Sequence, residues 1–343
     1  MNLVNLVRFS LVLTVVVIVL GAYTRLADAG LGCPDWPGCY GSLSVPNQHD
    51  EIALAQALYP SLVIETDKAW LEMIHRYFAS SLGLLVVCIS LMGIVSRQLS
   101  FVWASMLTGI VIFQAALGMW TVTMKLMPIV VVGHLLGGFT LFTLLALTQW
   151  RLSSQFPFKM SPSGLIRTKC LALVALFLVV IQIALGGWTS SNYAALMCTT
   201  LPICEGNWQS YLNFAQAFQL IQPTAETYEF GTLDYSSRMT IHIVHRVGAC
   251  VVSLSVILLV WSLWKRREVA LRNMAKSLLI VLIIQLSFGV ANVVLSLPMI
   301  IAVAHNIGAA VLLLVICRTN FLIWVAAKPC AYPSGEMEKG VNP

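Results

Sequence analysis

The chain has 343 residues, of which 59% are hydrophobic and only 10% are charged, with a mean hydropathy of +0.86. Soluble domains carry about 25% charged residues, so this composition excludes an ordinary soluble protein and indicates one that crosses a membrane repeatedly. The formal net charge of +6 comes from short loops between apolar segments, and no separate basic patch predicts a nucleic-acid partner.

Eight segments of about 20 mostly apolar residues follow one another, and each is long enough to cross a bilayer as a helix. The first could be read as a signal peptide, but no small-residue cleavage site follows it, and it has a counterpart later in the chain. The predicted fold is therefore an all-α polytopic membrane protein with eight transmembrane helices, at 7–26, 73–95, 101–121, 128–149, 168–189, 240–264, 275–296 and 299–325.

The charges of the loops predict the orientation of the helices. Two loops, after the fourth and sixth segments, are basic, whereas the loop after the first segment is acidic. Because basic loops stay in the cytoplasm, we expect both termini there and the long loops 27–72 and 190–239 outside. The basic residues are Arg151, Lys159, Arg167, Lys169, Lys265, Arg266, Arg267, Arg272 and Lys276.

The second half of the chain repeats the first. His75 and His134 match His245 and His305, with offsets of 245 − 75 = 170 and 305 − 134 = 171. Both halves begin on the same side, so the repeat is parallel, unlike the inverted repeats of many transporters. It predicts a four-helix bundle at 1–155, a second at 165–327 and a polar cytoplasmic tail at 328–343. Further matches are 21–24 with 186–189, Gln114 with Gln285, Gly118 with Gly289, and Pro128 with Pro298.

The four repeated histidines are the strongest candidates for a functional site. Ionisable residues in membrane segments are costly and usually functional. Two neutral imidazoles on opposite faces of a haem fill both axial positions of its iron, and facing helices of a bundle can supply them. A zinc site would need a closer cluster of ligands. We predict one haem site per half near the outer helix ends; the alternative is four unliganded core histidines.

The halves differ beside these histidines. Glu72 shares a helical face with His75, whereas the matching position, 72 + 170 = 242, holds His242. Glu72 is a candidate catalytic acid–base group, or else a solvated carboxylate favoured by a helix N-terminus. We expect His242 to be an interfacial polar residue and His49 to be solvated.

Three arginines lie near the predicted haem sites. Arg76 and Arg246 each follow a repeated histidine, and Arg25 occurs in the first half only, since Ser190 takes its place in the second. These arginines are candidate contacts for haem propionates, because a guanidinium binds a carboxylate with two hydrogen bonds. For Arg76 and Arg246, anchoring at the membrane interface remains an equal alternative.

The nine cysteines divide by their expected compartment. Four lie in the outer loops as two pairs, each six residues apart and linked by a segment containing Pro or Gly. We predict disulfides Cys33–Cys39 and Cys198–Cys204, because the outer compartment of a bacterium is oxidising; free thiols or metal ligands are the alternative. The other five are expected to pack as small apolar residues: Cys88, Cys170, Cys250, Cys317 and Cys330.

Several short strings around these residues resemble the haem A synthase family, and the resemblance covers about residues 5–325. It implies that the fold is an eight-helix duplicated bundle. It also implies that the protein is an oxidoreductase, which oxidises a methyl group of haem O through an alcohol to the formyl group of haem A. The strings are Gly21-Ala22-Tyr23-Thr24-Arg25-Leu26, Gly30-Leu31, Trp36-Pro37, Glu72-Met73-Ile74-His75-Arg76, Gly133-His134, His242-Ile243-Val244-His245-Arg246 and Ala304-His305-Asn306.

The resemblance also implies a role for each half. A permanent haem b would lie between His245 and His305, and the substrate haem O between His75 and His134. Glu72 matches an acidic residue considered important for turnover. The family's cysteine pair maps to Cys33 and Cys39, but not every member has it, so it is supportive and not obligatory.

The expected surroundings follow from this resemblance. The partners would be the lipid bilayer, haem O, haem O synthase and an electron acceptor, while a homo-oligomer stays open. Without a long targeting extension, a bacterial inner (plasma) membrane is favoured over a mitochondrial one. Two other functions fit part of the pattern. One is a two-haem membrane cytochrome that only transfers electrons, and a weaker one is a haem transporter.

Overall fold

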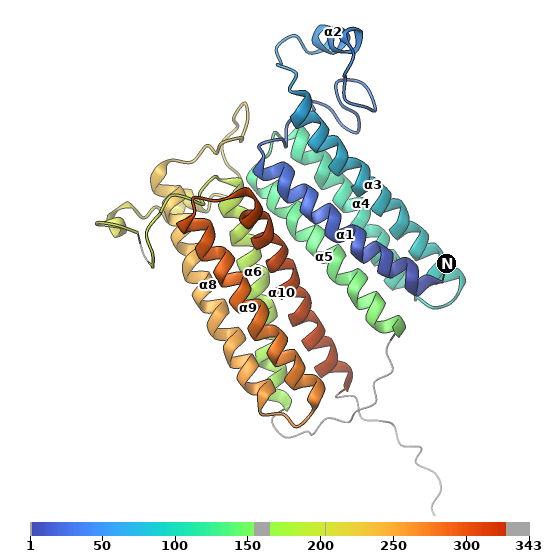
Figure 1. Ribbon diagram of the computed structural model, residues 1–343, viewed down its shortest axis with the longest axis vertical. Coiled ribbons are helices and arrows are strands. Elements are labelled where there is room, and N and C mark those ends of the chain that lie inside the picture. The colour runs from blue at the N-terminus through green and yellow to red at the C-terminus, as the bar shows by residue number, and fades with distance from the viewer. Residues whose placement is uncertain (1, 154–164, 203, 327–343) are drawn as a thin grey trace, which may run out of the picture.

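The computed structural model describes residues 2–153, 165–202 and 204–326. Within these ranges the protein is all-helical, and eight of its helices are long and apolar enough to cross a membrane (Figure 1). This confirms the predicted fold class. The eight are α1 (Leu3–Leu26), α3 (Thr66–Val95), α4 (Phe101–Thr123), α5 (Pro128–Ser153), α6 (Leu165–Ser191), α8 (Tyr235–Trp264), α9 (Val269–Val294) and α10 (Met299–Ala326).

The largest differences from the predicted helix bounds are at the first residues of α3, α9 and α8, where α9 begins at Val269 instead of residue 275. α3 begins at Thr66 instead of residue 73, and α8 begins at Tyr235 instead of residue 240. These extra turns are polar, so an apolar run does not reveal them. Asp234 caps α8 by accepting a hydrogen bond of 2.9 Å from the Ser237 backbone N–H.

The two long loops that are predicted to lie outside, called the outer loops below, contain three short helices that the sequence analysis missed: α2 (His49–Leu58), η1 (Trp208–Tyr211) and α7 (Phe214–Ala217). Gln48 and Glu51 form a capping box at the start of α2, and this pattern could have been found in the sequence. Figure 1 shows the outer loops together at one end of the long helices, with α2 farthest out.

The long helices form two rings of four. In the first ring α1 packs on α3, α3 on α4, α4 on α5 and α5 back on α1; α6, α8, α9 and α10 repeat this order. The two rings meet through α1 with α10, α5 with α6, and α5 with α10. The predicted division into 1–155 and 165–327 remains a prediction. Residues 154–164 and 327–343, including Lys159, Cys330 and the expected tail, lie outside the described residues.

The backbone carries the repeat as well. Residues other than glycine rarely adopt positive φ, yet they do so at matching positions of the two halves. Asp28 (φ 48°) matches Tyr193 (φ 53°) just after α1 and α6. Leu126 (φ 64°) matches Leu297 (φ 61°) in the turns that enter α5 and α10. The two rings are therefore built from the same local turns.

Candidate functional site

The two histidines of each pair lie on helices that are diagonal in their ring. His75 is on α3 and His134 on α5, and among the described residues these two helices do not pack against each other. His245 on α8 and His305 on α10 repeat this arrangement. The helix contacts therefore place the two histidines of each pair on opposite helices of one ring of four.

A glycine on the neighbouring helix lies beside each of the four histidine rings. A Cβ atom added at Gly21 would lie only 2.8 Å from His75 Cε1, and one at Gly118 3.4 Å from His134 Cε1. At the two second-half sites the corresponding distances are 3.3 Å (Gly186 to His245) and 3.2 Å (Gly289 to His305). A side chain at Gly21 would displace the His75 ring, and one at Gly186 or Gly289 would require a small shift of the facing ring, whereas a Cβ at Gly118 would only touch His134.

Three of the four histidines have a buried ring nitrogen without a hydrogen-bond partner, which is consistent with a ligand bound at each pair. His75, His134 and His305 each have a buried Nδ1 without a hydrogen-bond partner. Buried polar atoms are rarely left unpaired, so each such atom needs an explanation. Neutral imidazole is the form that binds haem iron, and membrane burial disfavours the charged form. A flat ligand between two facing rings suits these residues.

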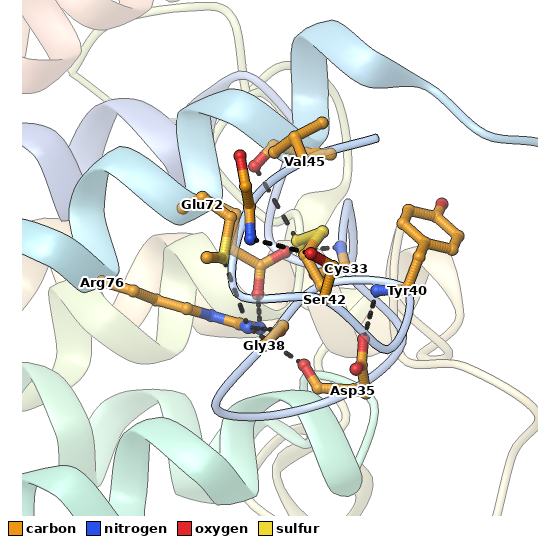
Figure 2. Close-up of a disulfide and its surroundings, with 12 residues drawn as sticks. Cys33, Asp35, Gly38, Tyr40, Ser42, Val45, Glu72 and Arg76 are labelled. Carbon is orange, nitrogen blue, oxygen red and sulfur yellow. Dashed lines mark hydrogen bonds and ion pairs between the residues drawn. A yellow bond between two sulfur atoms is a disulfide. The ribbon is translucent and has the colours of Figure 1, made fainter. Parts of the chain in front are cut away.

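Glu72 connects the helix of His75 to the first disulfide loop (Figure 2). It is 5% exposed, and its Oε2 accepts a hydrogen bond of 2.9 Å from the Cys33 backbone N–H. Its Oε1 forms a 2.6 Å ion pair with Arg76 Nη2. Arg76 Nη1 donates to the carbonyl oxygens of Asp35 (3.0 Å) and Gly38. Glu72 is therefore not the solvated helix-end charge of the alternative reading.

His242 and Arg246 make the same connection in the second half. The His242 ring is 4% exposed, and its Nδ1 lies 3.3 Å from the Cys198 backbone N–H. Arg246 Nε lies 3.2 Å from His242 Nε2, and Arg246 Nη1 donates to the Thr200 carbonyl at 2.7 Å. His242 is buried because it holds the second disulfide loop, as Glu72 holds the first. Its position at the membrane interface remains a prediction.

The arginines therefore have partners that the sequence analysis did not foresee. Arg76 and Arg246 hold loop carbonyls, which is neither of the two roles considered for them. Arg25 donates to the Tyr193 hydroxyl at 2.7 Å and to the Ser190 carbonyl at 2.8 Å. Propionate binding by these arginines remains a prediction, and it would require some of these donors to exchange partners.

The cysteine predictions are mostly confirmed. Both outer pairs form disulfides, Cys33–Cys39 and Cys198–Cys204, and Cys317 is buried as expected. Three other free cysteines, which were expected to pack as small apolar residues, are exposed instead: Cys88, Cys170 and Cys250. His49 is exposed, as predicted.

The first disulfide loop is acidic and partly buried. Burial, reinforced by the negative charges of Glu65, Glu72 and Asp35, raises the pKa of the Tyr40 phenol above its usual value of 10.0. Asp35 accepts hydrogen bonds from the backbone N–H groups of Tyr40 (2.6 Å) and Gly41 (2.9 Å). These contacts give the loop a fixed shape over the outer end of α3.

Comparison with known proteins agrees with this architecture. Residues 5–317 match the COX15-CtaA family, described as cytochrome oxidase assembly proteins. A protein named heme A synthase from Shewanella oneidensis is 52% identical over 94% of this chain and 97% of its own length. Proteins of the same name from Mesorhizobium japonicum and Maricaulis maris are 27% and 26% identical, over 91% and 86% of this chain and 85% and 88% of their own lengths. The chain belongs to the COX15-CtaA family.

Proposed function

We propose that this protein is a haem A synthase, which oxidises a methyl group of haem O to the formyl group of haem A. The observation that carries the proposal is the pair of facing, glycine-lined histidine sites in a chain 52% identical to a protein named heme A synthase. Two haem sites in one chain suit a reaction in which one haem is oxidised and another receives its electrons.

The two sites are assigned by the difference between the halves. His75 and His134 would hold haem O, and His245 and His305 would hold haem b. The first half is the substrate half because it alone has a carboxylate, Glu72, next to a repeated histidine. Glu72 is the only acidic side chain that the described part of the chain buries.

The reaction balances as two successive two-electron oxidations of one carbon. The first is R–CH₃ + H₂O → R–CH₂OH + 2e⁻ + 2H⁺, and the second is R–CH₂OH → R–CHO + 2e⁻ + 2H⁺. The class of enzyme is therefore an oxidoreductase that acts on a CH or CH₂ group. When bound, haem b supplies a redox centre that passes the electrons towards an external acceptor.

The chain's own residues bind, shield and handle protons. Each histidine pair would hold one haem within its ring of helices. The disulfide loop, held by Arg76 and Glu72, covers the outer end of α3 and limits the access of water. The Glu72 carboxylate retains free lone pairs beside its two partners, so it can take up protons that the oxidation releases.

The cellular setting follows from the chemistry and the charge distribution. The protein spans a bacterial inner membrane, with both termini in the cytoplasm and the haem sites near the outer face. Haem O synthase supplies the substrate, and a membrane electron acceptor removes the electrons. The structure contains one chain, and a homo-oligomer stays open.

The test is to co-express the protein with haem O synthase and to separate the extracted haems by chromatography. We expect haem A, together with the alcohol intermediate, and purified protein that retains one haem b and an exchangeable second haem. Two tightly held haems b and no haem A would instead support a two-haem cytochrome and contradict the proposal.

A further inference from the structure

Each of the four histidines sits at a corner where two neighbouring helices meet, and three corners share a four-residue pattern. One helix carries a glutamine four residues before the glycine that touches the ring. The other carries a glycine three residues after the histidine. The three sets are Gln114, Gly118, His134 and Gly137; Gln182, Gly186, His245 and Gly248; and Gln285, Gly289, His305 and Gly308.

The glutamine amides lie against their histidines. Gln114 Nε2 donates to the His134 backbone carbonyl at 2.9 Å. Gln182 Nε2 donates to the His245 carbonyl at 2.9 Å and lies 3.1 Å from the ring Nδ1. Gln285 Nε2 lies 3.5 Å from Nε2 of its histidine ring. Each amide is therefore placed to orient its histidine.

The second glycine of each corner makes room for the glutamine. A Cβ atom at Gly137, Gly248 or Gly308 would overlap the Oε1 atom of the facing glutamine. All three Oε1 atoms are buried and accept no hydrogen bond. A metal-bound histidine usually donates its second ring N–H to an acceptor, which fixes the orientation of the ring and increases its basicity. These three carbonyl oxygens are unused acceptors in the corners that hold His134, His245 and His305.

The corner of His75 departs from the pattern at two positions together. Val17 stands four residues before Gly21, and Phe78 stands three residues after His75. Valine offers no side-chain acceptor, and the larger Phe78 replaces the glycine that accommodates the amide elsewhere. His75 Nδ1 has no hydrogen-bond partner, and neither do the Nδ1 atoms of His134 and His305. The corner of His75 differs from the other three because no glutamine amide lies beside the histidine.

We propose that His75 is the releasable ligand of the substrate site, and that Gln114, Gln182 and Gln285 fix the other three histidines. This inference rests on the proposed function and deepens it. A permanent haem b needs two fixed ligands, whereas a substrate haem has to enter, react and leave. Val17 and Phe78 thus determine which of the four iron–histidine bonds opens. All five are positioning residues, since they act through the histidines.

Carbon monoxide reports an iron–histidine bond that opens, because it binds reduced haem only where an axial position becomes free. We expect the reduced, purified wild-type holoenzyme to exclude carbon monoxide from haem b and to bind it once haem O is loaded. The double variant Val17→Gln/Phe78→Gly recreates the three-corner pattern at His75. Its affinity for carbon monoxide at haem O should fall at least about tenfold, as expected when a histidine gains an outer partner.

The reciprocal variant is Gln182→Val, which gives His245 the surroundings of His75. Its haem b should become reactive to carbon monoxide, or be lost about 10- to 100-fold faster from folded protein. Gln149→Val is the matched control, because Gln149 is a glutamine of a membrane helix whose amide contacts Ser153, Val4 and Arg8 and no histidine. It should leave both haem spectra as in the wild type.

Inert haem b in Gln182→Val, combined with unchanged carbon monoxide binding in Val17→Gln/Phe78→Gly, would overturn the inference while leaving haem A synthesis intact. If the double variant does not fold, Gln182→Val decides the question alone. Failure of the wild type to make haem A would instead refute the proposed function, whatever the carbon monoxide result.

Discussion

Arg25 donates a 2.8 Å hydrogen bond to the backbone carbonyl of Ser190, and these two residues occupy the same position in the two halves, 165 residues apart. The same is true of Asp28 and Tyr193, whose side chains meet at 2.7 Å. The Arg25 guanidinium also lies 4.3 Å from the centre of the Tyr193 ring. Equivalent positions touch only near a twofold axis, so this cluster marks the pseudo-symmetry axis at the outer face.

Tyr193→Phe should weaken the junction between the halves. The change removes the hydroxyl that accepts from Arg25 and donates to Asp28. Leaving partly buried partners unsatisfied costs about 1–3 kcal/mol, so we expect a lower thermal unfolding midpoint in detergent. Tyr211→Phe is the control, since Tyr211 is 54% exposed. Equal midpoints for the two variants would contradict a role for the Tyr193 hydroxyl.

The contribution of the Tyr193 hydroxyl to the stability of the folded protein should depend on the ionisation of the phenol in the alkaline range. Burial raises the pKa of its phenol above the usual value of 10.0, and the hydrogen bond to Asp28 adds to this. Because the folded-state pKa is raised, the stabilisation is fully present below pH 10.0 and is lost as the pH rises through the folded value. The difference in unfolding midpoint between wild type and Tyr193→Phe should be constant near neutrality and shrink above pH 10.0. A change between pH 6 and 8, measured by the same melts, would argue against this cause.

Replacing His245 or His305 by alanine should remove an axial ligand of haem b. We expect loss of the six-coordinate optical spectrum and lower haem content after purification. His49→Ala is the control, because His49 is an exposed residue of the outer loop. Unchanged spectra and haem content in both variants would refute the assignment of haem b to the second half.

Glu72→Gln should separate catalysis from folding. Glutamine keeps the size and an acceptor for the Cys33 N–H but loses the charge that pairs with Arg76. Haem b should stay bound, while haem A formation falls sharply and haem O or its alcohol accumulates in extracts. Asp67→Asn, which changes an exposed acid in the first turn of α3, should leave turnover unchanged. Wild-type rates in Glu72→Gln would remove Glu72 from the reaction.

Cys33 and Cys39 should resist alkylation in unreduced, denatured protein, whereas the free thiols Cys88 and Cys170 should react. Peptide mapping after labelling measures this directly. Replacing both Cys33 and Cys39 by serine should cost about 2 kcal/mol, because the open loop gains conformational entropy in the unfolded chain. Ready labelling of Cys33 and Cys39 in assembled protein would contradict the disulfide.

The sequence by itself determined the eight membrane-spanning helices, the repeat and the four histidines. The length of an apolar segment decides whether it can cross a bilayer as a helix. A constant offset between two halves can be detected from residue numbers alone, without knowing which residues are in contact. The first disulfide could be predicted because Cys33 and Cys39 are close along the chain. The spacing of four residues between Gln182 and Gly186 could likewise have been found in the sequence, because it repeats that of Gln114 with Gly118 and of Gln285 with Gly289.

Only the tertiary structure decided what the charged residues touch. Arg76 follows His75 by one position, yet its guanidinium reaches the carbonyls of the disulfide loop some 40 residues earlier in the chain. The partner of a long side chain depends on which loop folds over its helix. The periodicity of the sequence does not predict such a contact. For the same reason His242 proved to be buried, because the loop that it holds covers it.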